Sequence, residues 1–391
     1  MPQKVGMEVS IAIGEVVKMT DTDVIAAYPI TPQTHIVEHL AELVAEGELD
    51  AEYIPVESEH SAMSACLGAV ASGARTFTAS SGQGLELMHE VLFVASAMRL
   101  PVIMAVSNRA LSGPLSVWGD HSDAMACRDT GWIQIFTENG QEVVDQTLCA
   151  FRIGEDPNVL LPVMVHLDGF HVSHMIESML LPEKEEVKSF LPAFKYPLPL
   201  DPQKPVAMGD FAPPFIYTEM KWAQEMNLRK AKETILAAWQ DFNRVFGRQY
   251  KPVETYRTEG AGTLLLTMGS YSETAMTAID QMREKGQSVG LLRLRLWRPF
   301  PFEELREAAG SAKTLVVLDR AITTGGPNGP VGSEIRAAFY NEPNRPKIVN
   351  FVGGLGGRDI TPEDFEEIVR RGMDIAVNGS PNEFEMYGVR E

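Results

Sequence analysis

An acidic run at residues 56–62 holds the side chains in this sequence that are best suited to proton chemistry. It reads Val56-Glu57-Ser58-Glu59-His60-Ser61-Ala62 and follows an apolar stretch, Tyr53-Ile54-Pro55, that predicts the end of a buried strand. Small residues at helical spacing come next, so both glutamates are expected in the first turn of a helix, where anions are favoured. A carboxyl group placed there can hold or share a proton. The structural alternative is that Ser58 or Ser61 caps the helix and the glutamates only favour its positive end.

Polar groups also follow two other predicted strands. Residues 24–28 read as a buried strand that runs into Thr31, which is held between two prolines that fix the backbone. Residues 100–106 read as another strand, with Arg109 just after it. The loops that follow parallel strands gather at one edge of the sheet, so Thr31, Glu59 and Arg109 are expected to converge there. A guanidinium at that edge can grip a carboxylate through two charge-assisted hydrogen bonds.

The elements that position these residues alternate along the first 175 residues. Helices are expected at 8–20, 33–46, 85–98 and 141–153, and strands at 24–28, 53–56, 75–79, 100–106, 131–136 and 159–165. The repeated order of strand, polar loop and helix predicts an α/β domain with a parallel sheet. Residues 111–123 are too rich in glycine for a helix and too polar for a buried strand, so they are expected to form a long ordered loop over the site. Within it, Asp120-His121-Ser122-Asp123 is spaced too tightly for a metal site and favours a hydrogen-bonded loop.

The composition shifts after residue 195. Four of the eleven residues from Lys195 to Pro205 are proline, which predicts a semi-rigid linker, and 215–247 read as an amphipathic helix. A second α/β pattern follows, with strands at 263–268, 289–294, 314–318 and 347–352 and helices at 274–284 and 362–371. The predicted organisation is therefore a first domain at 1–195, a linker and helical excursion at 196–252, and a smaller domain at 253–391.

The composition also argues against several classes of function. A net charge of -19 and a pI near 4.9 would repel nucleic acid and anionic lipid. The cysteines Cys66, Cys127 and Cys149 lie far apart without a C-x-x-C pair, so no metal cluster and no metal ligands are expected in this chain. The start, Met1–Val5, does not resemble a signal peptide, and no apolar run approaches the roughly 18 residues that span a bilayer. A cytoplasmic protein without a membrane partner is therefore expected.

Several familiar motifs are missing from the sequence. It contains no G-x-G-x-x-G after the first strand, no G-x-x-x-x-G-K-[ST] and no G-x-S-x-G, so hydride transfer to a nicotinamide and a serine nucleophile both lack their usual signatures. Gly353-Gly354-Leu355-Gly356-Gly357-Arg358 follows a predicted strand. It is weak evidence for phosphate binding, and a tight turn in a contact between domains explains it at least as well.

Six motifs carry a resemblance to a known family. They are Ala27–Thr34 (AYPITPQT), Val56–Ala62 (VESEHSA), Gly73–Leu85 (GARTFTASSGQGL), Asn108–Ser112 (NRALS), Arg128–Gln134 (RDTGWIQ) and Asp168–Phe170 (DGF). Together they resemble the alpha subunit of 2-oxoacid:ferredoxin oxidoreductases, with pyruvate:ferredoxin oxidoreductase nearest in pattern. They fill the first 175 residues densely, and Leu318-Asp319-Arg320 agrees in the second domain. Such agreement is highly specific for the family and weakly specific for the substrate.

The resemblance implies a thiamine diphosphate enzyme. This chain would supply a transketolase-like pyrimidine-side domain with a parallel sheet and a smaller domain like the transketolase C-terminal domain. Glu59 matches the glutamate that bonds the aminopyrimidine ring, where a shared proton favours the imino form that deprotonates the thiazolium carbon. Thr31 matches a threonine that faces the substrate, and Arg109 matches the arginine that binds the substrate carboxylate. Further cofactor contacts are implied for Pro29, Ile30, Ser81 and Gln83.

The implied reaction is the oxidative decarboxylation of a 2-oxoacid, with pyruvate first, and coenzyme A as acyl acceptor. Electrons would pass to iron–sulfur clusters in partner subunits and on to ferredoxin or another acceptor. The Gly-Asp-Gly run with which thiamine enzymes hold their divalent cation is absent here. Mg²⁺ and the diphosphate are therefore expected on a beta-type partner subunit, with gamma and ferredoxin-like subunits completing the complex.

Two alternatives stay open. Many family members carry alanine and asparagine where this chain has Gly113 and Ser116, so a larger 2-oxoacid such as phenylglyoxylate or a branched-chain acid remains possible. The chain could also be a structural subunit that keeps the fold and binds no cofactor. Such a subunit would have no reason to hold Glu59, Thr31 and Arg109 together, so their joint presence favours catalysis.

Overall fold

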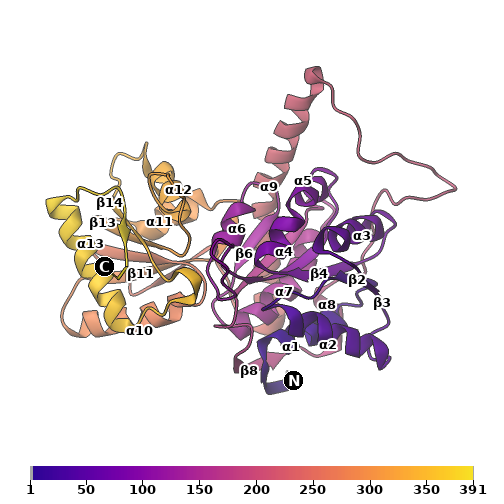
Figure 1. Cartoon of the computed structure of the whole chain (residues 1–391), viewed down its shortest axis with the longest axis horizontal. Coiled ribbons are helices and arrows are strands. Elements are labelled where there is room, and N and C mark those ends of the chain that lie inside the picture. Colours follow the sequence, from indigo (N-terminus) through magenta and orange to yellow (C-terminus); the bar gives the residue numbers. More distant parts are fainter. Residues whose placement is uncertain (1–2, 391) are drawn as a thin grey trace.

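The chain folds into two α/β bodies that lie side by side (Figure 1). The computed structural model describes residues 3–390. Met1 and Pro2, on which the prediction about a signal peptide partly rests, and Glu391 lie outside the described residues. None of the helices within 3–390 combines the length and the apolar composition that crossing a bilayer requires.

Seven strands build the sheet of the first body, in the order β12-β6-β7-β5-β4-β2-β3. They are β2 (Val24–Ala27), β3 (Glu52–Pro55), β4 (Thr76–Ser80), β5 (Ile103–Asn108), β6 (Ile133–Phe136), β7 (Val163–Asp168) and β12 (Leu296–Arg298). The six strands that the sequence indicates pair in parallel, as predicted. The short strand β12 was not predicted, and it adds to β6 in antiparallel orientation from far along the chain.

Strand β3 is half exposed, so the prediction of a buried strand before the acidic run is wrong. It lies at the edge of the sheet and borders only β2, so no strand within residues 3–390 pairs with its other edge. Its apolar residues Tyr53 and Ile54 are only half-buried. Glu59 follows this strand and therefore lies at a margin of the first body, although its own side chain is buried.

Helices cover both faces of this sheet. They are α1 (Val9–Met19), α2 (Thr34–Ala45), α3 (Glu59–Ala71), α4 (Gly82–Leu87), α5 (His89–Ala97), α6 (Ser122–Ala126), α7 (Gly140–Gly154), α8 (Lys184–Phe190) and α9 (Pro214–Phe246). One apolar core packs α1, α2, α7 and α9 against the sheet, and another packs α3, α4 and α5. The single helix predicted at 85–98 is two helices, because the backbone leaves the helical conformation at Met88. Strands β1 (Gln3–Glu8) and β8 (Ile176–Leu181) pair in a small sheet that was not predicted.

The second body contains a six-stranded sheet in the order β15-β14-β13-β10-β11-β9. Its strands are β9 (Val253–Tyr256), β10 (Thr263–Thr267), β11 (Val289–Leu294), β13 (Thr314–Asp319), β14 (Lys347–Val352) and β15 (Glu385–Met386), and its helices are α10 (Tyr271–Glu284), α11 (Phe302–Ala309), α12 (Pro330–Phe339), the short η1 (Leu355–Gly357) and α13 (Pro362–Asn378). The four predicted strands pair in parallel. Helix α13 continues past its predicted end at 371 because Gly372 lets it lie directly against Val316 of β13.

A buried polar network joins the two bodies. The Asp168 carboxylate, at the end of β7, accepts hydrogen bonds from Arg320 Nη1 (2.5 Å) and from the amide and hydroxyl of Ser270 (2.7 and 2.6 Å), and it pairs with His121 Nε2 (3.0 Å). Burial alone would raise the pKa of Asp168, but Arg320 and His121 hold it well below its usual range. Asp120 and His121 therefore lie in a hydrogen-bonded loop, as predicted, but this loop ends earlier than predicted because Ser122 and Asp123 begin α6.

The glycine-rich turn at 353–358 also belongs to this contact. Gly356 donates its amide hydrogen to Asp120 Oδ2 (3.1 Å), and a β-carbon at Gly357 would lie 2.7 Å from the β-carbon of Trp118. Of the two interpretations of this turn, the structure supports the domain contact. The turn thus packs against the loop at 111–120.

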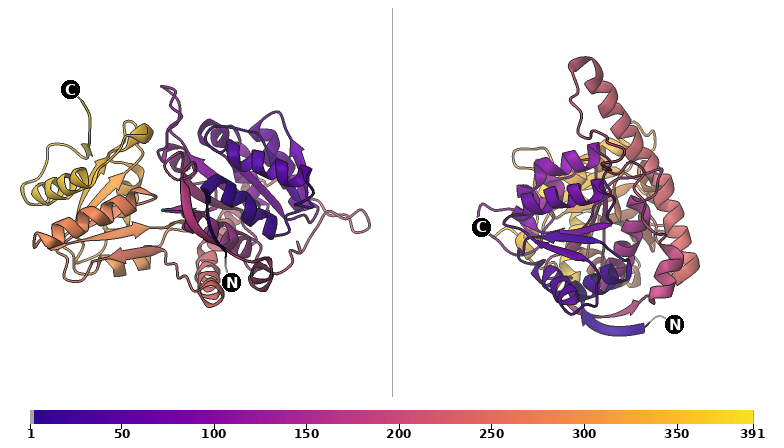
Figure 2. Two further views of the ribbon diagram at one scale, coloured as in Figure 1. Left: turned by 90° about the horizontal axis from the view of Figure 1, so that it is seen from below. Right: turned by 90° about the vertical axis from the view of Figure 1, so that its right-hand side faces the viewer.

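Helix α9 projects beyond both bodies together with the segment before it (Figures 1 and 2). Its later residues pack in the first core, including Ile235 and Trp239. The segment before α9 and the first turns of the helix carry large apolar side chains that the described chain leaves uncovered, with exposed fractions of 90% at Phe211, 83% at Phe215 and 64% at Trp222. Several large apolar side chains exposed within one segment are typical of a protein–protein contact surface.

Candidate active site

Glu59 is the first residue of α3, and the residues around it form the helix cap. Ser58 Oγ accepts a hydrogen bond from the Ser61 amide (3.2 Å), and the exposed Glu57 accepts one from the Ser61 hydroxyl (2.7 Å). The capping interpretation is therefore correct for Ser58 and accounts for Glu57. Glu59 is different, because its residue is only 5% exposed and its carboxyl group has no hydrogen-bond partner among the described residues. A buried carboxyl group without a protein partner is available to a ligand.

The first turn of α4 lies between Glu59 and Arg109. A β-carbon at Gly84 would lie 2.5 Å from Glu59 Oε1, and one at Gly82 would lie 3.0 Å from Arg109 Cδ. Gly82 also has φ +47°, a backbone conformation that favours glycine. Two glycines in one turn thus let the Glu59 carboxyl group and the aliphatic part of the Arg109 side chain approach the same short segment.

Arg109 contacts the Thr31 loop, as the sequence predicts. Its Nη1 donates to the Thr31 carbonyl oxygen (3.1 Å) and its Nε donates to the Ser116 carbonyl oxygen (2.9 Å). The guanidinium forms no ion pair within residues 3–390, so its charge is not engaged in a salt bridge there. Burial lowers its pKa from the usual value, against the effect of nearby Asp123, yet a guanidinium stays charged at neutral pH. The N–H groups without a protein acceptor remain free for an anion.

Asp123 hydrogen-bonds to the loops after β4 and β5, a role that was not predicted for it. Its Oδ2 accepts from the amides of Gly82 (3.0 Å) and Arg109 (2.9 Å), and its Oδ1 accepts from Asn108 Nδ2 (2.9 Å). Complete burial raises the pKa of Asp123 to about 7, against these hydrogen bonds. The only signal for it in the sequence is an acidic residue just after a glycine-rich loop, a residue type that readily accepts hydrogen bonds from main-chain amides.

The remaining predicted site residues differ in how far they are exposed to solvent. Thr31 and Pro29 are exposed and Ile30 is half-buried, all on the loop after β2. Ser81 is buried and donates its hydroxyl hydrogen to the Ser107 carbonyl (2.7 Å), so it joins the loops after β4 and β5. Gln83 is half-buried, and its Oε1 is buried without a hydrogen-bond partner within residues 3–390. Such an oxygen can accept a hydrogen bond from a ligand.

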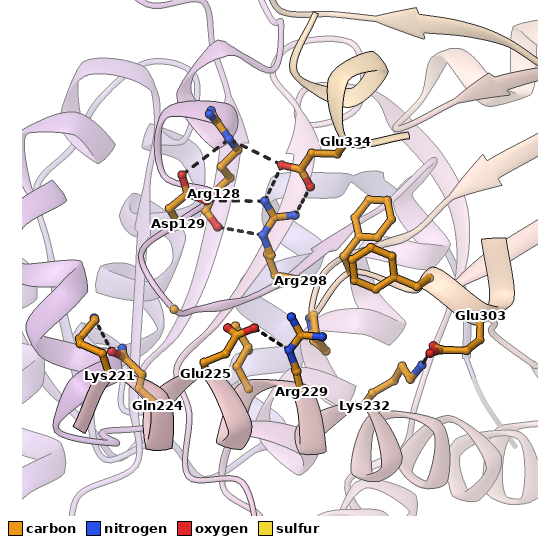
Figure 3. A pocket seen from close by; sticks show the side chains of 15 residues that line it. Arg128, Asp129, Lys221, Gln224, Glu225, Arg229, Lys232, Arg298, Glu303 and Glu334 are labelled. Atoms are coloured by element: carbon orange, nitrogen blue, oxygen red, sulfur yellow. Dashed lines mark hydrogen bonds and ion pairs between the residues drawn. The ribbon is translucent and has the colours of Figure 1, made fainter. Parts of the chain in front are cut away.

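A cavity of about 560 Å³ lies away from this centre, between α9 and the segment around β12 (Figure 3). Four acidic and five basic side chains line it. Its acidic groups are ion-paired with its basic ones, for example Glu334 with Arg298 (2.7 Å) and Glu225 with Arg229 (2.5 Å). The carboxylates therefore neutralise most of the positive charge that lines the cavity. The cavity has no free carboxyl group comparable to that of Glu59 among the residues that line it.

Comparisons with known proteins identify the family of the chain. A family model described as pyruvate flavodoxin/ferredoxin oxidoreductase, thiamine diphosphate-binding, matches residues 15–238, and one described as pyruvate:ferredoxin oxidoreductase core domain II matches 261–365. Pyruvate synthase subunit PorA of Methanothermobacter thermautotrophicus is 48% identical over 360 residues, which cover 92% of this chain and 93% of that protein. The PorA subunit of Thermotoga maritima is 45% identical over 384 residues, covering 97% and 96%. Ketoisovalerate oxidoreductase subunit VorA of Pyrococcus horikoshii is 43% identical over 371 residues, covering 94% and 93%.

Solved structures agree at the level of the fold. A 2-oxoglutarate:ferredoxin oxidoreductase from Magnetococcus marinus aligns with a TM-score of 0.73 at 20% identity, covering 95% of this chain and 65% of that one. A split-gene transketolase aligns with a TM-score of 0.55 at 12% identity, covering 95% and 100%. The transketolase-like α/β architecture is thus confirmed. With a family model over more than half of its length and relatives at 43–48% identity, the chain belongs to the thiamine diphosphate-binding pyruvate flavodoxin/ferredoxin oxidoreductase family.

Proposed function

We propose that this chain is the catalytic alpha subunit of a 2-oxoacid:ferredoxin oxidoreductase that oxidatively decarboxylates pyruvate with coenzyme A as acyl acceptor. The observation that carries the proposal is the approach of Glu59 and Arg109 to the same glycine turn. Within residues 3–390 the Glu59 carboxyl group has no hydrogen-bond partner and the Arg109 guanidinium forms no ion pair. Family membership and the names of the PorA relatives support the same reaction.

Thiamine diphosphate fits the residues at this centre. When bound, the cofactor supplies a nucleophilic carbon and a sink for the electron pair that decarboxylation releases. Glu59 would hold a proton on the ring nitrogen of the aminopyrimidine, because a buried carboxyl group without a protein partner makes its strongest hydrogen bond to such a ligand. The unpartnered Oε1 of Gln83 is a further acceptor on the same turn.

Arg109 would bind the carboxylate of the substrate. The carbonyl groups of Thr31 and Ser116 already fix the orientation of its guanidinium, so little side-chain entropy remains to be lost on binding. The exposed Thr31 lies beside it on the loop after β2, where its hydroxyl can face the same ligand. Charge-assisted hydrogen bonds of this kind contribute on the order of 1.5–3 kcal/mol.

We further propose that a beta-type subunit completes the cofactor site and holds Mg²⁺ and the diphosphate. Support comes from the missing Gly-Asp-Gly run, from the edge position of β3 next to Glu59, and from uncovered apolar side chains nearby on α4 and α5, including Leu87 (53% exposed) and Val94 (41%). The exposed segment around Phe211 and Phe215 would contact another subunit. Iron–sulfur clusters would lie in gamma and ferredoxin-like partners. The three buried, unpaired thiols fit a reducing cytoplasm.

The substrate assignment is tested by assaying the assembled complex with a panel of 2-oxoacids, coenzyme A and a viologen dye as electron acceptor. Pyruvate should give the highest kcat/KM. If 2-oxoglutarate or an aromatic 2-oxoacid gave a kcat/KM above that of pyruvate, the assignment would be wrong even though the reaction type held.

A branched-chain 2-oxoacid is the second candidate. The VorA relative is 43% identical, nearly as similar as the PorA relatives, and Gly113 and Ser116 make the loop at 111–118 less bulky than in many family members. Ser116 contributes its main-chain carbonyl to Arg109, while Gly113 is exposed with open space around it. In the same panel, a kcat/KM for 2-oxoisovalerate above that for pyruvate would favour this candidate.

Replacing Gly84 by alanine should lower turnover without unfolding the protein. The added methyl group would lie 2.5 Å from Glu59 Oε1, so the carboxyl group has to move, and a displacement near 1 Å of a catalytic group costs on the order of 10²-fold. Viologen reduction by the assembled complex measures the loss. The matched control is Gly262→Ala, where a β-carbon makes only ordinary contacts at 3.8 Å or more. Equal turnover in the two variants would contradict the role given to Gly84.

Replacing Arg109 by alanine should lower kcat/KM for the 2-oxoacid by roughly 10–100-fold, the equivalent of about 1.5–3 kcal/mol. Thiamine diphosphate affinity should stay nearly constant, because the guanidinium is assigned to the substrate. Steady-state kinetics and cofactor titration of the same complex separate the two effects. Loss of cofactor affinity with an unchanged KM for the 2-oxoacid would assign Arg109 to the cofactor instead.

A further inference from the structure

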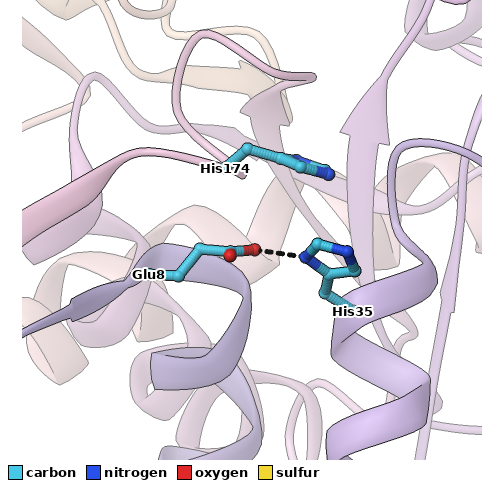
Figure 4. Close-up of side chains that lie close together, drawn as sticks. All are labelled: Glu8, His35 and His174. Carbon is cyan, nitrogen blue, oxygen red and sulfur yellow. Dashed lines mark hydrogen bonds and ion pairs between the residues drawn. The ribbon is translucent and has the colours of Figure 1, made fainter.

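Glu8, His35 and His174 form a cluster that the reaction does not use (Figure 4). Each offers one ligand atom, and these atoms lie within 4.8 Å of one another. Glu8 Oε1 and His35 Nδ1 are 2.7 Å apart, and the ring centroids of His35 and His174 are 4.6 Å apart. The three residues are half-buried, so the cluster is held by the protein and still open to solvent.

Three separate elements fix these side chains. Glu8 ends β1 immediately before α1, His35 lies in the first turn of α2, and His174 lies between β7 and β8. The His174 segment is fastened to the start of α1, because the amides of Val9 and Ser10 donate to the carbonyls of Met175 (3.1 Å) and Ser173 (3.0 Å). The arrangement is therefore built by the fold and does not come from one flexible loop.

Hydrogen bonding also orients one of the imidazoles. Ser173 Oγ lies 2.8 Å from His174 Nδ1 and also accepts from the amide of Phe170 (2.9 Å). A hydroxyl that holds one ring nitrogen leaves the other for a ligand, which is the usual arrangement around a metal-binding histidine.

We propose that Glu8, His35 and His174 bind a divalent cation of the zinc class, with water in the fourth position. Two imidazole nitrogens and one carboxylate oxygen are a ligand set that suits Zn²⁺, and a half-exposed site leaves room for a water ligand. Zinc–ligand bonds near 2.0–2.2 Å place ligand atoms roughly 3.3 Å apart, so His174 has to move inward by on the order of 1 Å. The cation would take the place of the hydrogen bond between Glu8 and His35, and the proton of that bond would pass to solvent.

The site would brace the loops around the active centre. His35 is four residues beyond Thr31, and His174 contacts Phe170, whose ring contacts Trp118 in the loop at 111–120 (centroids 4.7 and 4.8 Å apart). The sequence gives no sign of this site, since 27 residues separate Glu8 from His35 and the spacing matches no metal motif. The expectation that this chain has no metal ligands is thus replaced here by a proposed site.

The test uses the full chain without a polyhistidine tag, treated with a chelator and then titrated with Co²⁺ and, separately, with Zn²⁺. Visible absorption reports the geometry around Co²⁺, and calorimetry gives the stoichiometry and Kd for Zn²⁺. One equivalent should bind with a micromolar or lower Kd. His35→Gln and His174→Gln should each weaken zinc binding by at least about 10-fold. Replacing a residue that only supports a metal ligand already costs about that much, so losing a ligand should cost no less.

The matched control is His39→Gln. His39 pairs with Glu15 at 2.9 Å but has no second imidazole beside it, so this variant should bind Zn²⁺ as the unchanged chain does. Circular dichroism shows whether each variant is folded, and a zinc-dependent rise in the melting temperature of the unchanged chain gives a second readout that needs no variant. The proposal fails if no saturable binding occurs, if both ligand variants bind normally, or if His39→Gln loses binding to the same extent.

Discussion

Replacing Glu59 by glutamine should lower the turnover of the assembled enzyme by about 10²–10⁴-fold, the usual contribution of a positioned acid or base. Glutamine has nearly the same shape, so α3 and its Ser58 cap should be retained. The glutamine amide cannot exchange a proton with the aminopyrimidine ring, so the expected fall in turnover comes from lost proton transfer and not from misfolding. Viologen reduction with saturating pyruvate and cofactor measures kcat, and gel filtration checks that the complex still assembles.

The control for this variant is Glu57→Gln. Glu57 is exposed, and its oxygen accepts a hydrogen bond from Ser61 that a glutamine oxygen can also accept, so turnover should change less than about twofold. The comparison separates the buried carboxyl group from its neighbour two positions away. An active Glu59→Gln complex would remove the catalytic assignment and leave the capping interpretation of the run.

Replacing Arg320 by alanine should lower the free energy of unfolding by about 3–5 kcal/mol, because it leaves the buried Asp168 carboxylate without its cation. Both side chains are 1% exposed. Arg320 also donates to the Gly119 carbonyl (3.1 Å) and lies over the Tyr271 ring at 3.8 Å, so the variant opens the contact between the two bodies as well. Urea unfolding followed by circular dichroism measures the change.

An exposed arginine provides the comparison for this loss. Arg370 pairs with Glu367 on the surface of α13, and Arg370→Ala should change the free energy of unfolding by less than about 1 kcal/mol. If Arg320→Ala were no more destabilising than Arg370→Ala, the buried network would not be what joins the two bodies.

The parallel core of the fold could be predicted because its strands are short apolar runs that end at polar loops. β2, β4, β5 and β7 are buried on both faces and carry the hydrophobic signal that the sequence displays. The pairing of β12 with β6 could not be predicted, because three residues hold too little pattern and their partner lies more than 150 residues earlier. The edge position of β3 depends equally on which strands pair, which no local pattern contains.

The site, like the fold, has features that local sequence patterns predict and features that depend on contacts between distant segments. Glu59, Thr31 and Arg109 follow predicted strands, so the parallel topology brings their loops to one edge, and the contact between Arg109 and Thr31 confirms part of that expectation. Gly84 and Asp123 were missed because their roles lie in close approach and in main-chain hydrogen bonds, which depend on the distance between segments far apart in the sequence. Residue types alone do not carry that information.

The most direct test of the central claim is calorimetry of this chain with thiamine diphosphate and Mg²⁺, first alone and then with the beta-type subunit. If the chain supplies only the pyrimidine side of a shared site, it should show no saturable binding alone at micromolar concentration, and binding should appear when the partner is added. Micromolar binding by this chain alone would show that the cofactor site is complete within it and would contradict the account.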